Sequence, residues 1–237
     1  MRILAFETSA KAASAAVMAD GVLLGEFYQN TGLTHSQTLL AMAQELLVEC
    51  GLNMDDVDAV AVAAGPGSFT GVRIGVAAAK GLAWGRELPC CGVSTLAAMA
   101  RSFGAWQGYV CPVMDARRSQ VYNALFHANC GEYTRIREDR AISLQDLGKD
   151  LQNLAEPIFL VGDGSILCYN TLLEIVPGLV LPPEHRMHQR AAGVALEAQR
   201  AIAAGESTDG AALVPNYLRL SQAERERAER AAKAQQA

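Results

Sequence analysis

A glycine-rich segment in the first third of the chain limits what this sequence can fold into. It reads Gly-Pro-Gly-Ser-Phe-Thr-Gly-Val-Arg-Ile-Gly over residues 65–75 and follows an apolar run over 57–64. Very small side chains continue through residues 76–82 at spacings typical of a helix. The pattern predicts a buried strand, a tight turn, and then a helix that another surface can approach closely.

Two uses compete for this segment, and the first is anion binding. A helix N-terminus attracts phosphate because its first N–H groups are unpaired and carry partial positive charge. The loop is not a P-loop, since Val72 and Arg73 stand where Lys and Ser/Thr would follow Gly71. The candidate residues of such a site, with the end of the first strand included, are Glu7, Thr8, Ser9, Gly65, Gly67, Ser68, Thr70 and Arg73.

The second use is close packing. Gly71, Gly75 and Ala79 recur every four residues, with Ala78 and Leu82 beside them. Each glycine inside a helix costs about 1 kcal/mol relative to alanine, and tight contact would compensate for that cost. The contact could be with this protein's own sheet or with another subunit, and the sequence leaves both open.

Composition restricts the class of protein. Of 237 residues, 51% are hydrophobic and 19% are charged, so a sizeable core can form. The chain has 20 basic and 25 acidic side chains, for a net charge of −5. A protein that binds nucleic acid alone usually has a basic surface, so we expect RNA to be bound only together with a more basic partner.

Signals for export and for disulfides are absent from the sequence. The opening residues are too short for a signal peptide, and no apolar run approaches the roughly 20 residues of a membrane span. The six cysteines include no Cys-x-x-Cys pair, and the adjacent Cys90 and Cys91 have poor geometry for a bridge. We expect reduced thiols in a cytoplasmic protein that does not contact membranes.

Short patterns mark the ends of several elements. Asp20-Gly21 predicts a hairpin turn between two strands, and Thr34 followed by Gln37 matches a capping box before a helix. Ser94 and Ser143 are predicted N-caps of later helices. A strand is expected over residues 133–137, after a turn at 130–132.

The order of elements predicts two similar halves. Strands come first and alternating helices and strands follow, and the pattern starts afresh after residues 104–108. The sequence therefore predicts an α/β protein with one lobe over 1–104 and another over 105–220, which resembles the actin, sugar-kinase and Hsp70 architecture. A helix over 190–205 is expected near the first lobe, and 221–237 is expected to be a charged tail.

A few polar residues are further candidates. His35 is interpreted as a polar residue near a helix cap, in preference to a catalytic role. His185 and His188 lie three apart in a proline-rich linker, without a third ligand for a metal. The turn that contains Arg117 and Arg118 is interpreted as a solvated hairpin, and the alternative is a basic tip that faces a partner or RNA.

Taken together, segments spread over nearly the whole chain resemble the TsaB family, also called YeaZ. The glycine-rich segment 65–75 is the most specific of them. The others are Ile3 to Ser9, His35-Ser36, Lys80 to Ala83, Pro112 to Arg117 with Val121-Tyr122, and Pro215 to Arg219.

The resemblance implies an actin-like (ASKHA) fold of two lobes and a part in making N6-threonylcarbamoyladenosine in tRNAs that read ANN codons. It implies a catalytic partner subunit, TsaD, a small ATPase, TsaE, and a homodimer when TsaD is absent. TsaD carries a metal-binding His-x-x-x-His, and the positions that correspond to its histidines are Thr95 and Met99. A hydroxyl and a thioether cannot replace two imidazoles on a divalent ion. We therefore expect a non-catalytic subunit without a cofactor.

The resemblance also implies that the first two long helices, over 36–50 and 70–84, form the partner contact. Gly75→Leu is then expected to weaken pairing while the monomer stays folded. A small-molecule kinase of the actin-like class and a metallopeptidase are the rival functions. The expected contact residues are Leu39, Ala43, Leu46, Gly71, Ile74, Gly75, Ala78, Ala79 and Leu82.

Overall fold

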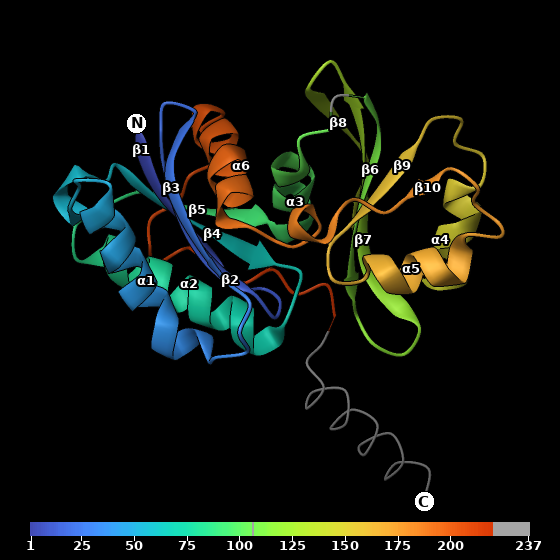
Figure 1. Cartoon of the computed structure of the whole chain (residues 1–237). Helices are drawn as coiled ribbons and strands as arrows, with labels where there is room; N and C mark the ends of the chain where they lie inside the picture. Colours follow the sequence, from blue (N-terminus) through green and yellow to red (C-terminus); the bar gives the residue numbers. More distant parts are fainter. Residues whose placement is uncertain (106, 220–237) are drawn as a thin grey trace, which may run out of the picture.

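The computed structural model describes residues 1–105 and 107–219, so the tail predicted over 221–237 lies outside the described residues. Two five-stranded sheets lie side by side, with helices against both of their faces (Figure 1). The first sheet contains β1 (Arg2–Glu7), β2 (Ala13–Ala19), β3 (Val22–Gln29), β4 (Ala59–Gly65) and β5 (Cys90–Ser94). The second contains β6 (Gln107–Asp115), β7 (Gln120–Asn129), β8 (Glu132–Ser143), β9 (Ile158–Val161) and β10 (Leu179–Val180). The helices are α1 (His35–Glu49), α2 (Phe69–Trp84), α3 (Thr95–Phe103), α4 (Leu144–Leu151), α5 (Ser165–Leu172) and α6 (Ala191–Ala203).

The first sheet has the strand order β3-β2-β1-β4-β5. Its first three strands form an antiparallel meander, and β4 and β5 then join in parallel. The hairpin predicted at Asp20-Gly21 is confirmed: both residues are left-handed, with φ of 49° and 82°. Such a turn matches the twist of the strands that it joins.

Of the three helix caps predicted from the sequence, the structure has two and lacks one. The Ser94 and Ser143 side chains accept the N–H groups of the residues three positions later, so both predicted caps are confirmed. Thr34 does precede α1, but its side chain makes no cap bond. The N–H of Gln37 instead bonds the Thr34 carbonyl, so the predicted capping box is wrong.

The second sheet has the order β10-β9-β6-β7-β8, and its edge strand is longer than the sequence indicates. β8 extends over Glu132–Ser143, whereas residues 133–137 were expected. The extension contains Asp139 and Arg140, which form ion pairs with Arg135 and Asp150. Because these charges are paired, the polar segment remains in the sheet.

Alternating residues of each sheet face two different cores. On the first sheet, one face packs against α1 and α2 and the other against α6. On the second sheet, one face packs against α4 and α5 and the other against α3. The helix α3 also packs along α6, so these two helices form the layer between the sheets (Figure 1). Within the described residues, every helix is too short or too polar to span a bilayer.

Candidate functional site

The glycine-rich loop joins β4 to α2 and is covered by a segment from the far end of the chain. The Asn216 N–H donates to the Ala64 carbonyl at 2.7 Å. A side chain at Gly65 would overlap the carbonyl of Asn216, and Gly65 also has a φ of 122°, which other residues rarely adopt. Gly65 is therefore needed for a backbone approach within this chain.

The next glycine of the loop is packed in the same way. The Ser68 N–H donates to the Ser9 carbonyl at 2.6 Å, and a side chain at Gly67 would meet that carbonyl. The Ser68 hydroxyl accepts the Gly71 N–H and caps α2. Two amides that a phosphate would need are thus already bonded within the protein.

The small-residue stripe of α2 faces the loop between β1 and β2. The Thr8 hydroxyl donates to the Gly71 carbonyl at 2.8 Å. A side chain at Gly71 would overlap the Thr8 carbonyl, and one at Gly75 would overlap the Thr8 hydroxyl and press on Val62. The contact that compensates for these glycines is internal, which contradicts the expectation that Gly75→Leu leaves the monomer folded.

The nine predicted contact residues are mostly core residues. Helical periodicity places them toward the sheet, where they join the core that α1 and α2 share with β1, β2 and β4. Six of them are buried within this chain, and their role in a partner contact stays a prediction. Those six are Leu39, Ala43, Leu46, Gly71, Gly75 and Ala79, whereas Ile74, Ala78 and Leu82 are half-buried.

Four large apolar side chains on these two helices, or just before the first of them, are exposed to solvent. Leu33, Leu40, Val48 and Trp84 are 55%, 51%, 62% and 71% exposed. Leu40 and Val48 lie on α1, Trp84 lies on α2 and Leu33 precedes α1, and the two helices are neighbours (Figure 1). We call this set of four the outer face.

A sequence signal for the outer face was present and was missed. Leu40 follows the buried Leu39, and Trp84 follows the buried Ala83. Successive helical residues point about 100° apart, so the second apolar residue of such a pair lies off the core-facing stripe. The pattern is incomplete as a signal, because Leu47 also follows a core residue, Leu46, and is only 4% exposed.

Arg73 does not serve the loop as a free cation. Its guanidinium lies 3.7 Å from the centre of the Phe69 ring, and its Nε donates to the Tyr217 hydroxyl at 2.8 Å. The Phe69 and Tyr217 rings stack with centroids 4.8 Å apart. Arg73 thus fastens the C-terminal segment to α2, and Thr70 beside it is exposed.

The glycine-rich loop also forms one wall of a cleft of about 600 Å³ between the two sheets. Glu7, Thr8 and Ser9 are buried beside it at the end of β1. Burial raises the pKa of Glu7 to about 7, although the Ser9 N–H donates to its Oε1 at 2.6 Å and opposes the shift. Burial likewise raises the pKa of Asp163, which lines the cleft. The negative charge of Asp163 also contributes to the raised pKa of Glu7.

A strained turn forms the other side of the cleft. Arg117, Arg118 and Ser119 have φ of 65°, 57° and 56°, a left-handed run that is costly for non-glycine residues. The turn joins the paired strands β6 and β7 as predicted. The Arg219 Nη1 donates to the Ala116 carbonyl at 2.8 Å and ties the C-terminal segment to this turn. The C-terminal segment therefore contacts both sides of the cleft, the glycine-rich loop through Asn216 and the turn after β6 through Arg219.

Thr95 and Met99, the predicted counterparts of the two TsaD histidines, are buried in α3. His35 is bonded through its Nε2 to the Ala10 carbonyl at 2.9 Å, near the start of α1. Among residues 1–105 and 107–219, no group of three or more His, Cys, Asp or Glu side chains is arranged to hold a metal ion.

Comparison with known proteins connects this geometry to one family. The family model described as TsaD, tRNA N6-adenosine threonylcarbamoyltransferase, matches residues 29–226. The tRNA threonylcarbamoyladenosine biosynthesis protein TsaB of Bacillus subtilis (strain 168) is 31% identical over 226 residues, which cover 94% of this chain and 96% of that protein.

Solved structures agree with the fold. YeaZ from Pseudomonas aeruginosa superposes with a TM-score of 0.73 at 29% identity, covering 92% of this chain and 99% of that one. The ROK hexokinase from Thermus thermophilus has a TM-score of 0.50 at 11% identity, over 86% of this chain and 100% of that one, which shows a shared fold alone. The predicted α/β, actin-like (ASKHA), two-lobed fold is confirmed.

Proposed function

Because this chain belongs to the TsaB family, we propose that it is the non-catalytic subunit of the complex that forms N6-threonylcarbamoyladenosine in tRNA. The substrates are tRNAs that read ANN codons. In this role the chain binds a TsaD-type catalytic subunit and organises it. The complex works in the cytoplasm, where its tRNA substrates are.

The observation that carries the proposal is the outer face of α1 and α2. Leu40, Val48 and Trp84 of the neighbouring helices α1 and α2 are exposed to solvent, and large apolar side chains that gather on one surface mark interaction sites. Tryptophan is enriched among residues that dominate binding energy at interfaces. The outer face therefore takes over the contact role that the sequence had assigned to the inner residues of the same helices.

The residues of α3 support the proposal that this chain carries out no transfer chemistry of its own. Thr95 and Met99 stand at the positions of the catalytic relative's histidines, and neither side chain is a ligand that a hard or borderline divalent ion prefers. Both side chains are packed in the core.

Three further partners belong to the proposal. A TsaE-type ATPase docks on the complex of the two related subunits, and tRNA binds only within that complex, since this chain carries a net charge of −5. In the absence of the catalytic subunit, the outer face pairs with a second copy of this chain.

Co-purification with a TsaD-type subunit, followed by a tRNA modification assay, tests the function. We expect modified tRNA only when both subunits are present, and Leu40→Asp should abolish co-purification and modification together. Ile166→Asp is the matched control, because Ile166 is an equally exposed apolar residue on α5, at 56% against 51% for Leu40. Transfer to tRNA by this chain alone would contradict the proposal.

An ATP-dependent small-molecule kinase of the actin-like class is the second candidate. It is favoured by the cleft and by two buried atoms beside it, Glu7 Oε2 and Ser9 Oγ, which have no hydrogen-bond partner among the described residues. The Ser68 amide argues against it, because the Ser9 carbonyl already occupies that donor. ATP binding or hydrolysis by the purified chain alone would favour the kinase.

A further inference from the structure

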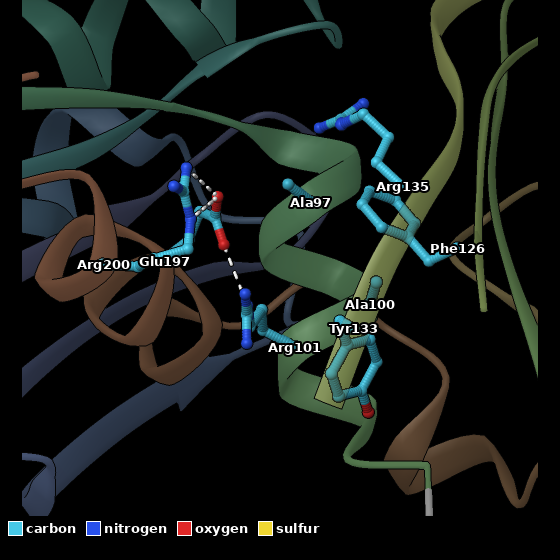
Figure 2. Close-up of a pocket in the computed structure, with 8 residues that line it drawn as sticks. All are labelled: Ala97, Ala100, Arg101, Phe126, Tyr133, Arg135, Glu197 and Arg200. Atoms are coloured by element: carbon cyan, nitrogen blue, oxygen red, sulfur yellow. Dashed lines mark hydrogen bonds and ion pairs between the residues drawn. The ribbon is translucent and has the colours of Figure 1, made fainter. Parts of the chain in front are cut away.

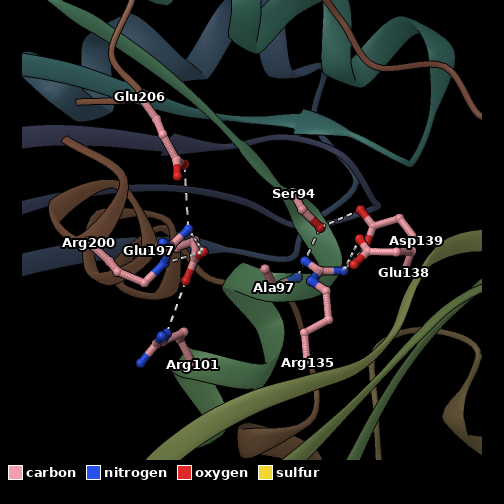
Figure 3. Close-up of polar contacts among 9 residues, drawn as sticks. All are labelled: Ser94, Ala97, Arg101, Arg135, Glu138, Asp139, Glu197, Arg200 and Glu206. Carbon is pink, nitrogen blue, oxygen red and sulfur yellow. Dashed lines mark hydrogen bonds and ion pairs between the residues drawn. The ribbon is translucent and has the colours of Figure 1, made fainter. Parts of the chain in front are cut away.

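Two groups of basic side chains lie between the lobes, and the first is neutralised within the chain. Arg101, Arg135 and Arg200 line a hollow of about 290 Å³ between α3, α6 and β8 (Figure 2). The carboxylates that pair with these three guanidinium groups are Glu138, Asp139, Glu197 and Glu206 (Figure 3). This first group is therefore an ion-pair network that leaves no positive charge for an anionic ligand.

The second group lies at the cleft beside the glycine-rich loop. Lys11, Arg117 and Arg219 line this cleft of about 600 Å³, and the exposed Arg118 follows Arg117 in the turn between β6 and β7. We call these four residues the basic rim. They come from the β1–β2 loop, the β6–β7 turn and the C-terminal segment, so only the fold brings them together.

The basic rim carries more positive charge than its surroundings neutralise. Among the described residues, the carboxylates that line the cleft are Asp115 and Asp163. Arg117 Nη1 lies 3.9 Å from Asp115 Oδ2, and the Arg117 side chain is still 88% exposed. Asp146 in the first turn of α4, which contacts the β6–β7 turn, is already paired with Lys149. Even with the buried Glu7 counted as charged, four cations face three carboxylates at the cleft.

The turn that carries two of these cations is strained and firmly held. Arg117, Arg118 and Ser119 are all left-handed. The Gln120 N–H donates to the Arg117 carbonyl at 3.2 Å, and the Leu144 N–H donates to the Ser119 carbonyl at 3.2 Å. Strained backbone persists only where its surroundings fix it, and it gathers at ligand-binding sites. The strain therefore favours a binding role for this turn over a simple connection between strands.

Aromatic rings lie in the same cleft as the basic rim. Tyr217 lines the cleft with one ring face stacked on Phe69, and it is 41% exposed. Tyr122 of β7 lines the cleft from the second sheet. Single-stranded RNA is bound by such a combination, because basic side chains hold its phosphates while aromatic rings stack on its unpaired bases. An acidic peptide would need the cations but not the rings.

We propose that the basic rim and the cleft behind it bind a single-stranded stretch of the tRNA, with phosphates on the four cations and a base on the free face of the Tyr217 ring. The cleft volume is within the range of small-molecule sites and accommodates about one nucleotide. This inference rests on the proposed function, because the chain meets tRNA only within the complex. The catalytic subunit supplies the rest of the affinity, since this chain has a net charge of −5.

The complex with a TsaD-type subunit tests the phosphate contacts, with tRNA affinity measured by fluorescence anisotropy at several salt concentrations. Arg117→Gln and Arg118→Gln should each raise the Kd about fivefold and lower the slope of log K against log salt by about 1, because each removes one phosphate contact. Arg137→Gln is the matched control. Arg137 is exposed on β8 outside the cleft, so its loss should leave the Kd within about twofold.

The base contact is tested at Tyr217. Tyr217→Phe and Tyr217→Leu both remove the hydroxyl that bonds Arg73, but only the first keeps a ring. Tyr217→Leu should bind tRNA about fivefold or more weakly than Tyr217→Phe, with the same salt slope. A lower slope for Tyr217→Leu would instead show that the C-terminal segment had moved and taken Arg219 from the rim. Equal Kd values for the two variants would overturn base stacking.

The remaining outcomes separate this inference from the proposed function. If no complex forms, or if it modifies no tRNA, the proposed function fails and RNA binding at the rim fails with it. If the complex modifies tRNA while Arg117→Gln and Arg118→Gln act no more strongly than Arg137→Gln, only the contact at the basic rim is wrong. If the two rim variants weaken co-purification with the catalytic subunit instead, the rim binds an acidic protein surface and the assignment to RNA is wrong.

Discussion

The two faces of the α1–α2 layer use similar side chains for opposite purposes. Leu39 is 1% exposed and packs on the first sheet, whereas the next residue, Leu40, is 51% exposed on the outer face. On α2, Gly71 meets the backbone of Thr8 on the inner side, and Trp84 faces solvent on the other. The comparison teaches that a rotation of about 100° along these helices separates an apolar residue that packs in the core from one that is exposed.

The largest expected effect lies on the inner face. Gly75→Leu forces a side chain into the Thr8 hydroxyl and Val62, and it disturbs the Thr8–Gly71 hydrogen bond. We expect the free energy of unfolding to fall by about 3 kcal/mol or more. Urea denaturation measures it, with Gly81→Leu as control, because no atom lies within 4 Å of a side chain placed at Gly81. If both substitutions lowered the free energy of unfolding equally, the proposed difference between the inner and the exposed side of α2 would be wrong.

The second effect concerns the buried carboxyl group of Glu7, the residue before Thr8. Folding raises the pKa of Glu7 from 4.5 to about 7, so the folded state prefers the protonated form. The wild type should therefore lose stability as the pH rises from about 4.5 to 7. Glu7→Gln, which stays neutral, should be more stable at pH 8 by up to about 3 kcal/mol and gain little at pH 4.

Thermal or urea unfolding at several pH values measures this difference. Glu49→Gln, an exposed position on α1, controls for the loss of a negative charge. A difference between wild type and Glu7→Gln that does not change with pH would show that folding does not raise the pKa of the Glu7 carboxyl.

The third effect tests the outer face. Trp84→Ala should weaken binding to a TsaD-type subunit by about 2 kcal/mol, because a large aromatic anchor is lost. The stability of the isolated chain should change by less than about 0.5 kcal/mol, since the side chain is 71% exposed. Surface plasmon resonance on the purified subunits gives the affinity. Unchanged affinity would move the partner contact away from α2.

The smallest effect compares one substitution at two glycines of α2. Gly81→Ala fills open space in a helix and should stabilise the chain by about 0.5–1 kcal/mol. Gly71→Ala has the same chemistry but would collide with the Thr8 carbonyl, so it should destabilise. Two denaturation curves suffice, and the same sign for both would contradict the assigned orientation of the helix.

Much of the fold could be predicted because its signals are local. The Asp20-Gly21 turn and the Ser94 and Ser143 caps depend on atoms within three residues of one another, so the sequence contains their whole explanation. The extension of β8 did not follow, because Asp139 and Arg140 look unsuitable for a strand until their ion-pair partners are in place.

The sequence predicted where the candidate site lies, but not which residues of this chain pack against its glycines. The sequence placed the glycine-rich loop between a strand and a helix, where it lies. It could not tell that Ser9 and Asn216 fill the space that the glycines leave. Nothing in the sequence grouped Arg101 with Arg135 and Arg200, because residues so far apart meet only through packing of the lobes.

The sequence by itself determined the order of strands and helices, the turn chemistry, the family and the absence of a histidine pair in α3. Each of these depends on residue identity or on neighbours along the chain. Only the tertiary structure decided which side of α1 and α2 is the core, what the glycines accommodate, and where three arginines converge. The physical reason is that burial and long-range contacts form only when the helices pack against the two sheets. Within a helix, a shift of one residue is enough to separate a core position from an exposed one.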